Sequence, residues 1–514
     1  MISPQLYRKT PHPWDLLFNW LAARGPALGV AAIALLLYAT TAAPGLTWAH
    51  DGADGGDLIA ACTSGGVPHP SGYPVYCLLA RPFAHLPLGP LAHRFNLFSA
   101  VAAALAVGIL ADLIRSVLLE AGLGARGSGA IAMLSGLIGA LGPTLWSQAV
   151  ITEVYALHAL FLTLLGRCAW AAHHQGSLKV WLSFGVVAGL GLGNHLTLAL
   201  TFPGVFLWLW PLRQRRSALA ALGGLALGLC AYLYVPLAAG AAPPVSWGDA
   251  RDLAGFWWLV SGQLYRHYVL AVPLALWPGR LAAIARGALR QLTLPCLALA
   301  LWSAQGAGAG HVRRLLWCSG SAALLPALYA LGYNTSDSHV YLLPVWLVSI
   351  LWLALGAARV WMALPAGRLR ALVPALLALV AIWLGYAGWP EMDLRDDRVA
   401  EEWLQAVRSR APLGAVIITG ADTHTFALDY LQWGLGERRD LVALDGELLA
   451  YPWYLRQVQS RYGRPIPDTD LQRLIAEYHA MAVPVLLADP RPELEAVYRL
   501  VPEGAFWRVY PAPQ

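Results

Sequence analysis

The segment from His50 to Pro74, HDGADGGDLIAACTSGGVPHPSGYP, carries three aspartates within seven residues and no lysine or arginine. Asp54 and Asp57 are three residues apart, so they share one face if the segment begins a short helix. Capping of a helix N-terminus accounts well for one aspartate but poorly for three. The segment directly follows a run long enough to cross a bilayer, and acids at such a place usually serve catalysis or ligand binding. We therefore interpret Asp54 and Asp57 as catalytic or ligand-binding residues.

Further polar residues are scattered through an otherwise apolar chain. His69 lies in the rigid segment VPHPSGYPVY (67–76), whose prolines either aim it at a ligand or simply return the chain to the membrane. Arg94 stands where the next apolar run begins, as an interfacial anchor or as a cation for an anionic head group. The remaining candidates, each weak alone, are Glu153, Tyr155, Asn194, His195, Trp247, Asp249, Asp337 and His339.

The composition shows what must position these residues. Of the 514 residues, 58% are hydrophobic and only 12% are charged, whereas a soluble domain carries about 25% charged residues. We therefore predict a polytopic α-helical membrane protein with about eleven transmembrane helices. Residues 1–390 would form this part, including an acidic first outer loop at 45–93. The apolar runs are 26–44, 94–119, 129–147, 150–172, 179–193, 195–211, 217–240, 283–305, 313–333, 339–358 and 368–388.

The distribution of arginine and lysine predicts the orientation. Basic residues cluster at the N-terminus, with Arg8 and Lys9, and in alternate turns such as the one containing Arg213. The positive-inside rule then places the N-terminus in the cytoplasm and the C-terminus outside. With that assignment every polar candidate falls on the outer side, which predicts one polar cavity open to the outside. Because the basic residues cluster in alternate turns, we interpret the net charge of +6 as a signal of membrane topology and not of nucleic-acid binding.

The composition changes after residue 390. Apolar segments at 415–420, 440–445, 484–489 and 507–511 alternate with helical patterns. This alternation predicts a small extracytoplasmic α/β domain over 391–514 with a largely parallel sheet. Asp422 and His424 follow its first strand, where such sheets often bind ligands. We favour the simpler interpretation that Asp422 or Thr423 caps the next helix, and we expect the domain to roof the cavity and to help select an acceptor.

The cysteines and the familiar catalytic motifs say little about the function of this chain. Cys62 and Cys77 could meet outside the membrane, but their spacing alone does not predict a bond. The chain has no P-loop, GxGxxG, GxSxG, HExxH or paired CxxC motif, so soluble nucleotide chemistry is not expected.

An acidic first outer loop, a Pro-rich return and a span that begins near Arg94 resemble the GT-C class of integral-membrane glycosyltransferases. More closely, the chain is similar to a family of bacterial and animal membrane proteins whose animal member is a protein O-mannosyltransferase acting on plexin-type extracellular domains. The similarity rests on DGGDLIAA, GVPHPSGYPVY, TEVYALHALF, GLGLGNHLT, PPVSWGD and YNTSDSHVYLLP, which run in family order across most of 45–345. The family usually has Asp-Ser-Gly-Glu where this chain has Asp54-Gly-Gly-Asp57, and His-Pro-Pro-Gly where it has His69-Pro-Ser-Gly.

The resemblance implies an inverting glycosyltransferase of a bacterial-type inner or plasma membrane. Its donor would be a polyprenyl phosphate carrying a sugar such as mannose, and its acceptor a hydroxyl group of a protein or glycan on the outer face. Asp54 would act as general base, and His69, Arg94 and His339 would stabilise the departing phosphate. Asp57 would hold sugar hydroxyls or help to bind a divalent cation.

The competing hypothesis is a transporter or lipid-binding membrane protein with an outward polar vestibule. A transport path needs polar groups in the inner halves of the spans as well. Acids are almost absent there, Asp112 and Glu120 being the main exceptions, and this favours the enzyme.

Overall fold

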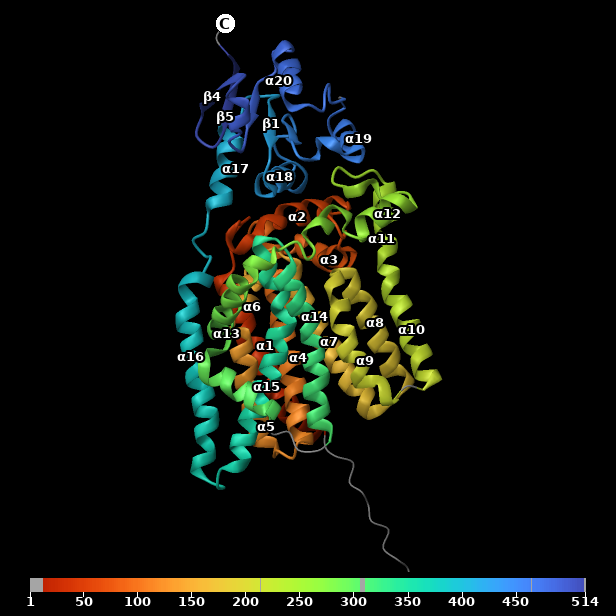
Figure 1. The fold of residues 1–514 in the computed structure, drawn as a ribbon, viewed down its shortest axis with the longest axis vertical. Helices are drawn as coiled ribbons and strands as arrows, with labels where there is room; N and C mark the ends of the chain where they lie inside the picture. The colour runs from red at the N-terminus through yellow and green to blue at the C-terminus, as the bar shows by residue number, and fades with distance from the viewer. Residues whose placement is uncertain (1–12, 213, 306–309, 464, 513–514) are drawn as a thin grey trace, which may run out of the picture.

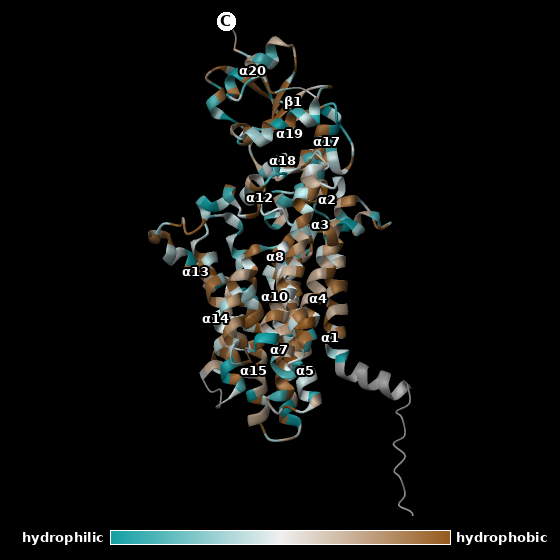
Figure 2. Cartoon of the chain, turned by 90° about the vertical axis from the view of Figure 1, so that its right-hand side faces the viewer, coloured by the Kyte–Doolittle hydropathy of each residue, from teal (hydrophilic) through white to brown (hydrophobic). Residues whose placement is uncertain are grey.

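A helical bundle and an α/β part stacked on one of its ends make up the molecule (Figure 1). This arrangement is seen in a computed structural model, which describes residues 13–212, 214–305, 310–463 and 465–512. Arg8, Lys9 and Arg213, which contribute to the predicted orientation, lie outside the described residues. Brown, hydrophobic residues predominate along the bundle, and teal, hydrophilic residues are frequent in the α/β part (Figure 2).

Within the described residues, eight helical segments are long and apolar enough to cross a membrane. They contain α1 (Pro13–Thr41), α4 (Leu91–Glu120), α7 (Val154–Gln175), α10 (Arg215–Leu229) with α11 (Tyr234–Gly240), α13 (Trp277–Gln305), α14 (His311–Gly332), α15 (Leu343–Ala363) and α16 (Leu372–Met392).

Three of the eleven predicted spans are not single long helices. Helices α5 (Ala125–Ala140) and α6 (Pro143–Ala149) would form a ninth span, bent by 67°. Pro143 is the first residue of α6, and a proline there interrupts the hydrogen-bond ladder of the preceding helix. The other two correspond to shorter apolar helices, α8 (Leu178–Asn194) and the segment Leu196–Leu212, which contains η3 (Leu196–Thr201) and α9 (Phe202–Leu209). The structure therefore has helices at all eleven apolar runs, eight of which meet the length of a single straight span.

Glycines allow α8 and α10 to pack closely. A Cβ atom on Gly185 would lie 2.0 Å from the carbonyl oxygen of Ala221, and one on Gly224 would lie 2.1 Å from that of Leu182. Both helices therefore need a residue without a side chain at their contact, as is common between helices in lipid.

The acidic segment forms short helices that lie across the end of the bundle, beneath the α/β part (Figure 1). They are η1 (Ala49–Asp54), α2 (Gly55–Ser64), α3 (Pro74–Ala80) and η2 (Arg81–His85). A disulfide between Cys62 and Cys77 joins α2 to α3. The same end carries η6 (Trp247–Asp249), α12 (Leu253–Val260), η7 (Gln263–Tyr268), η8 (Leu274–Leu276) and η9 (Ser336–Leu342).

The α/β part contains a five-stranded sheet in the order β2-β1-β3-β5-β4. β1 (Val416–Thr419) pairs in parallel with β2 (Val442–Asp445) and β3 (Val485–Leu487), and β5 (Trp507–Pro511) runs antiparallel to β3 and β4 (Tyr498–Pro502). Each of the four segments that the sequence predicts as strands contains one, whereas β4, a partly exposed edge strand, was not predicted. The helices are α17 (Val399–Arg410), α18 (Asp422–Asp429), α19 (Pro452–Tyr462) and α20 (Leu471–Ala480).

The α/β part and the bundle are in intimate contact. A Cβ atom on Gly56 of α2 would lie 2.2 Å from the carbonyl oxygen of Phe426 in α18. The two backbones therefore touch directly at the acidic segment, and the α/β part covers the end of the bundle where Asp54 and Asp57 lie.

Candidate active site

A cavity of about 550 Å³ lies between the end of the bundle and the α/β part. Its wall combines carboxylates, tyrosines and amides from six segments of the chain. The lining residues include Trp48, His50, Asp51, Asp54, His69, Tyr73, Gln148, Glu153, Tyr155, Tyr265, Tyr268, Tyr333, Asn334, Asp337, Tyr341, Asp422 and Thr423.

Asp54, His69 and Asp57 form a hydrogen-bonded row at this cavity. The Oδ2 atom of Asp57 lies 2.7 Å from Nδ1 of His69, and it also accepts a hydrogen bond of 2.9 Å from the His69 backbone N–H. On its other side, Nε2 of His69 lies 3.2 Å from Oδ2 of Asp54. Asp57 is fully buried, whereas the Asp54 side chain is 34% exposed. Asp54 is therefore the carboxylate of this row that faces the cavity.

Two contacts hold Asp57 and His69 in place. Trp247 of η6 donates an indole N–H to Oδ1 of Asp57 at 3.0 Å. Phe426 of α18 stacks on the His69 ring with centroids 5.7 Å apart. Every oxygen of the Asp57 carboxylate thus has a donor, and the imidazole is fixed by parts of the chain far apart in sequence.

The carboxylates control the protonation of the histidine. Burial alone would lower the pKa of His69, but the negative charges and hydrogen bonds of Asp54 and Asp57 raise that pKa well above its usual value. A protonated His69 donates from both ring nitrogens, from Nδ1 to Asp57 and from Nε2 to Asp54.

Two other acids of the cavity have raised pKa values. Burial, and then the negative charge of Asp54, raise the pKa of Glu153 well above its usual value. Burial and Asp54 likewise raise the pKa of Asp422 to about 7. Glu153 is the N-cap residue of α7, and its side chain accepts a hydrogen bond from the backbone of Val154.

Of the seven residues predicted to line the cavity, three are in its wall and two lie behind it, whereas Trp247 and Asp249 are not in the wall. Glu153, Tyr155 and Asp337 line the cavity, and the hydroxyl of Tyr155 lies 3.4 Å from Oδ2 of Asp337. His195 packs behind the wall against Tyr155, with ring centroids 5.3 Å apart. Asn194 is buried behind it and donates to the carbonyl of Val154.

Other predicted residues have different positions. Asp249 pairs with Arg251 and Arg456, so it links η6 to α19 rather than lining the cavity. Arg94 donates hydrogen bonds to the carbonyls of Ala84 and Gly89, and it is absent from the cavity wall. The first interpretation of Arg94, an anchor at the start of α4, fits these contacts better than a phosphate-binding role.

His339 lines a second cavity of about 450 Å³, which shares His50, Thr335 and Ser336 with the first. Two arginines of α13 lie in its wall. Arg280 donates to the carbonyl of Tyr333 at 2.7 Å, and Arg290 pairs with Glu391 of α16. Apolar residues of the bundle, such as Trp346, complete it. A cationic site thus adjoins the acidic cavity beside apolar helices.

Several residues of the two cavities were not predicted. Tyr73, Tyr265, Tyr268, Tyr333 and Tyr341 line the first cavity, and Arg280 and Arg290 line the second. The tyrosines look like ordinary interface residues in the sequence, and the arginines look like topology signals. Tyr73, Tyr333 and Tyr341 lie within the motifs GVPHPSGYPVY and YNTSDSHVYLLP, and that was the available signal for these three.

The favoured interpretation of Asp422 as a helix cap is wrong. The N-cap residue of α18 is Ala421, and no side chain caps this helix. Asp422 and Thr423 face the cavity instead, so the α/β part contributes to its roof as expected. His424 does not reach the cavity wall; its Nδ1 lies 2.8 Å from Asp489, and its ring stacks on Trp403.

A divalent cation was one expectation for this site. Among the described residues, no three His, Cys, Asp or Glu side chains are arranged so that they could hold a metal ion. Asp57 has three donors around its carboxylate, so its geometry supports a role in holding His69 rather than in binding a cation.

Comparison with proteins of known fold identifies the class. A crystal structure of ArnT from Cupriavidus metallidurans in the apo state matches with a TM-score of 0.60 and 14% identity, over 96% of this chain and 98% of ArnT. The structure of ArnT bound to undecaprenyl phosphate matches with a TM-score of 0.58 and 13% identity, over 96% and 97% of the two chains. This chain therefore shares the fold of ArnT, and its apolar helices make it a polytopic helical membrane protein.

Within that class, its sequence is related to the protein O-mannosyl-transferase TMEM260. Residues 54–217 match the family described as the protein O-mannosyl-transferase TMEM260 N-terminal domain. The Mus musculus protein O-mannosyl-transferase TMEM260 is 26% identical over 438 residues, which cover 79% of this chain. The match spans 60% of the length of that relative.

Proposed function

We propose that this protein is a membrane glycosyltransferase that moves a sugar from a polyprenyl phosphate to a hydroxyl group of an acceptor. The observation that carries the proposal is the row Asp57–His69–Asp54, which places one partly exposed carboxylate on a cavity that adjoins a cationic site. The relation to a protein O-mannosyl-transferase supports mannose as the sugar and a protein as the acceptor. The fold shared with a protein that binds undecaprenyl phosphate supports the lipid-linked donor.

The proposed reaction is a single displacement with inversion. Asp54 takes the proton of the acceptor hydroxyl while that oxygen forms a bond to the anomeric carbon. The bond between the anomeric carbon and the phosphate oxygen breaks at the same time, and polyprenyl phosphate leaves as an anion. His69 stays between the two aspartates, and its Nε2 contact keeps the Asp54 carboxylate correctly oriented until the proton is transferred.

The second cavity is suited to the departing phosphate. Arg280, Arg290 and His339 provide positively charged or hydrogen-bonding groups there, and such groups stabilise negative charge that develops in the transition state. The apolar helices beside this cavity provide a surface for the lipid tail. The sugar would then reach from the phosphate toward Asp54, past the shared residues His50, Thr335 and Ser336.

Gln148 is suited to holding the sugar. Its side chain is 1% exposed and lines the first cavity, and its Oε1 has no hydrogen-bond partner among the described residues. A buried amide oxygen without a partner is costly, so a sugar hydroxyl that donates to it would be bound favourably.

The arginine distribution supports an outward position for the cavities and the α/β part, since the basic turns lie at the other end of the bundle. It follows that the donor would be used on the outer face of an inner or plasma membrane.

A transporter is less well supported. The two acids of the inner halves are paired: Asp112 contacts Arg24 and Arg167, and Glu120 contacts His174. They therefore serve as local ion pairs at the end opposite to the cavities and do not continue a polar path through the bundle.

The direct test is an assay of transfer in detergent. Purified protein is given a radiolabelled polyprenyl-phosphate mannose, a matched polyprenyl-phosphate glucose, and folded extracellular domains or peptides as acceptors. Transfer of label to an acceptor hydroxyl, with inversion at the anomeric carbon, is expected. Binding of the donor without transfer to any hydroxyl acceptor would contradict the enzyme and favour the lipid-binding alternative.

The second cavity leads to a prediction about donor affinity. Replacing Arg290 by methionine removes a charged hydrogen bond to the phosphate, and such bonds contribute about 1.5–3 kcal/mol. We expect the KM for the donor to rise roughly ten- to a hundredfold, with a smaller change in kcat. Arg94→Met is the matched comparison, because Arg94 is bonded to carbonyls outside the cavity. Weaker donor binding in Arg94→Met but not in Arg290→Met would place the phosphate elsewhere.

The raised pKa of Asp422 leads to a prediction about the pH dependence of kcat/KM for the donor. Its pKa is raised to about 7, first by burial and then by Asp54 and Asp445, so it is neutral below that pH and anionic above it. As the pH rises through about 7, the cavity gains a negative charge that repels the anionic donor, and kcat/KM for the donor should fall. Asp422→Asn is uncharged at every pH and should lose this decline. A profile of kcat/KM between about pH 5.5 and 9 tests this, and an unchanged alkaline limb in Asp422→Asn would contradict it.

A further inference from the structure

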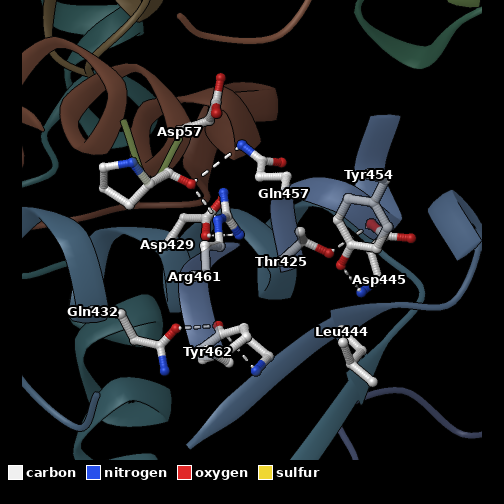
Figure 3. A network of polar contacts seen from close by, with 12 residues as sticks. Asp57, Thr425, Asp429, Gln432, Leu444, Asp445, Tyr454, Gln457, Arg461 and Tyr462 are labelled. Atoms are coloured by element: carbon white, nitrogen blue, oxygen red, sulfur yellow. Dashed lines mark hydrogen bonds and ion pairs between the residues drawn. The ribbon is translucent and has the colours of Figure 1, made fainter. Parts of the chain in front are cut away.

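Helix α19 of the α/β part forms hydrogen bonds to the segment that carries Trp247. Gln457 donates to the carbonyl oxygen of Pro244 at 3.2 Å, and Arg461 donates to the same oxygen. In Figure 3, dashed lines from Gln457 and Arg461 meet at one carbonyl oxygen. The guanidinium of Arg461 also pairs with Asp429 of α18 at 3.0 Å.

This ion pair lies inside the protein. The side chain of Arg461 is 4% exposed and that of Asp429 is 6% exposed. Taking two charges out of water is unfavourable, and a buried ion pair contributes little net stability compared with apolar residues of similar size. Its position therefore points to a role in orientation, because the planar guanidinium fixes the direction of each bond it donates.

A short chain of contacts leads from Pro244 to the candidate active site. The next residue, Val245, accepts a hydrogen bond of 2.9 Å from the backbone N–H of Val67, and Trp247 donates its own N–H to the carbonyl of Val67 at 3.1 Å. The Trp247 ring then donates to Asp57, whose other oxygen holds His69. Val67 is two residues before His69, so this segment fixes both the backbone beside His69 and the carboxylate that orients its ring.

We propose that Arg461, paired with Asp429, is a positioning residue that holds the Asp57–His69–Asp54 row in its active geometry through Pro244 and Trp247. The proposal rests on the proposed function for its effect on transfer, but not for its effect on His69. It assigns to the α/β part a role in catalysis beyond covering the cavity.

The simpler explanation is that Arg461 only helps the α/β part to dock. The chain offers a comparison for docking, because Arg456 of the same helix pairs with Asp249 of the same segment at 2.7 Å. That pair is exposed, with 57% of the Arg456 side chain accessible, and it does not touch Pro244. Loss of the Arg456 pair should therefore weaken docking slightly without loosening Trp247.

The test uses full-length variants chosen to fold. Arg461→Met alone leaves Asp429 buried without a partner, so the main variant is the double substitution Arg461→Met with Asp429→Leu, which replaces the pair by apolar residues of similar size. Arg456→Met is the matched control. The thermal midpoint of each purified protein shows whether it is folded.

The primary measurement is the titration of His69 by NMR of histidine-labelled protein in detergent, with the signal assigned through His69→Gln. If Trp247 loosens, the contact between Asp57 and His69 weakens, and the pKa of His69 should fall by about one unit or more. The other titratable groups that face His69 are present in every variant, so they do not cause a difference. These groups are Asp54, Asp57, Tyr73, Glu153, His195 and Asp422.

The second measurement separates kcat from KM. Misplacement of a reacting group by a small distance can cost up to about a hundredfold in rate, so kcat should fall roughly ten- to a hundredfold in the double variant, with the donor KM unchanged. Arg456→Met should keep both the wild-type titration and the wild-type kcat.

Each outcome decides between the two roles. A folded double variant whose His69 titrates as in the wild type overturns the positioning role, whatever the proposed reaction is. A lowered pKa of His69 in a protein that transfers no sugar in any form supports the positioning role and contradicts the proposed function instead. An equal fall of kcat in Arg456→Met would reduce Arg461 to a docking residue.

Discussion

Asp54→Asn is expected to lower kcat for sugar transfer by about 10²- to 10⁴-fold, the usual contribution of a general base. Asparagine keeps the size of the side chain and can still accept a hydrogen bond from Nε2 of His69, which lies 3.2 Å from Oδ2 of Asp54. It cannot take a proton from the acceptor hydroxyl. The KM for the donor should change little, because the proposed site for the phosphate and lipid tail is the second cavity.

The measurement is kcat and donor KM with radiolabelled polyprenyl-phosphate sugar, alongside the thermal midpoint. Glu153→Gln serves as the comparison, since burial and the charge of Asp54 raise the pKa of Glu153 and so favour the neutral form of this carboxyl group. A neutral amide there should cost far less than the change at Asp54. Full activity in Asp54→Asn would remove Asp54 as the base, and a larger loss in Glu153→Gln would move that role to Glu153.

The fold was predictable where it depends on composition. The eleven apolar runs, the change after residue 390 and the strands at 416–419, 442–445, 485–487 and 507–511 follow from hydropathy and periodicity. The side on which polar residues gather also followed, because charges are kept out of the bilayer and most acids of the bundle lie at one end of the helices, with Asp112 and Glu120 as the main exceptions. Asp54, His69, Glu153, Tyr155 and Asp337 indeed line one cavity.

Three details depend on contacts between distant segments, which no local pattern contains. Arg94 and Arg280 both lie near the end of an apolar run and both donate to backbone carbonyls, and only the packing shows that Arg280 lines a cavity whereas Arg94 does not. Asp422 sits at a typical capping position, but Gly56 brings α18 against α2 so closely that Asp422 is directed toward Asp54. The pairing of Cys62 with Cys77 likewise needs the turn of the chain between α2 and α3.

For Asp57, the structure narrows the role that the sequence suggests. The sequence places it beside Asp54 as an equal candidate, but the structure surrounds it with three donors: the indole N–H of Trp247, the backbone N–H of His69 and Nδ1 of the His69 ring. An ionised carboxylate only accepts hydrogen bonds, so it is the one small side chain that satisfies all three. Its role is to hold His69 and to keep it protonated.

Asp57→Asn should therefore lower kcat about as much as Asp54→Asn, by roughly 10²- to 10⁴-fold. An amide turns one acceptor into a donor, so whichever way it is rotated, it sets one N–H group against another in a fully buried site. The loss of negative charge also lowers the pKa of His69, so less of the imidazole is protonated beside Asp54. The expected signature is a fall in kcat together with a lower pKa of His69, with the donor KM preserved.

Asp57→Glu tests separately the negative charge of residue 57 and the length of its side chain. Glutamate is the residue the related family usually has here, and it keeps an acceptor-only group for His69 and Trp247. Asp57 is fully buried, so one added methylene must be accommodated by its neighbours at a cost of about 1–3 kcal/mol in the free energy of unfolding. We expect kcat within about tenfold of the wild type and a lower thermal midpoint. If Asp57→Glu is as inactive as Asp57→Asn, the exact reach of the carboxylate to His69 matters more than its charge; if both are fully active, His69 does not depend on Asp57, and the row is not the catalytic unit.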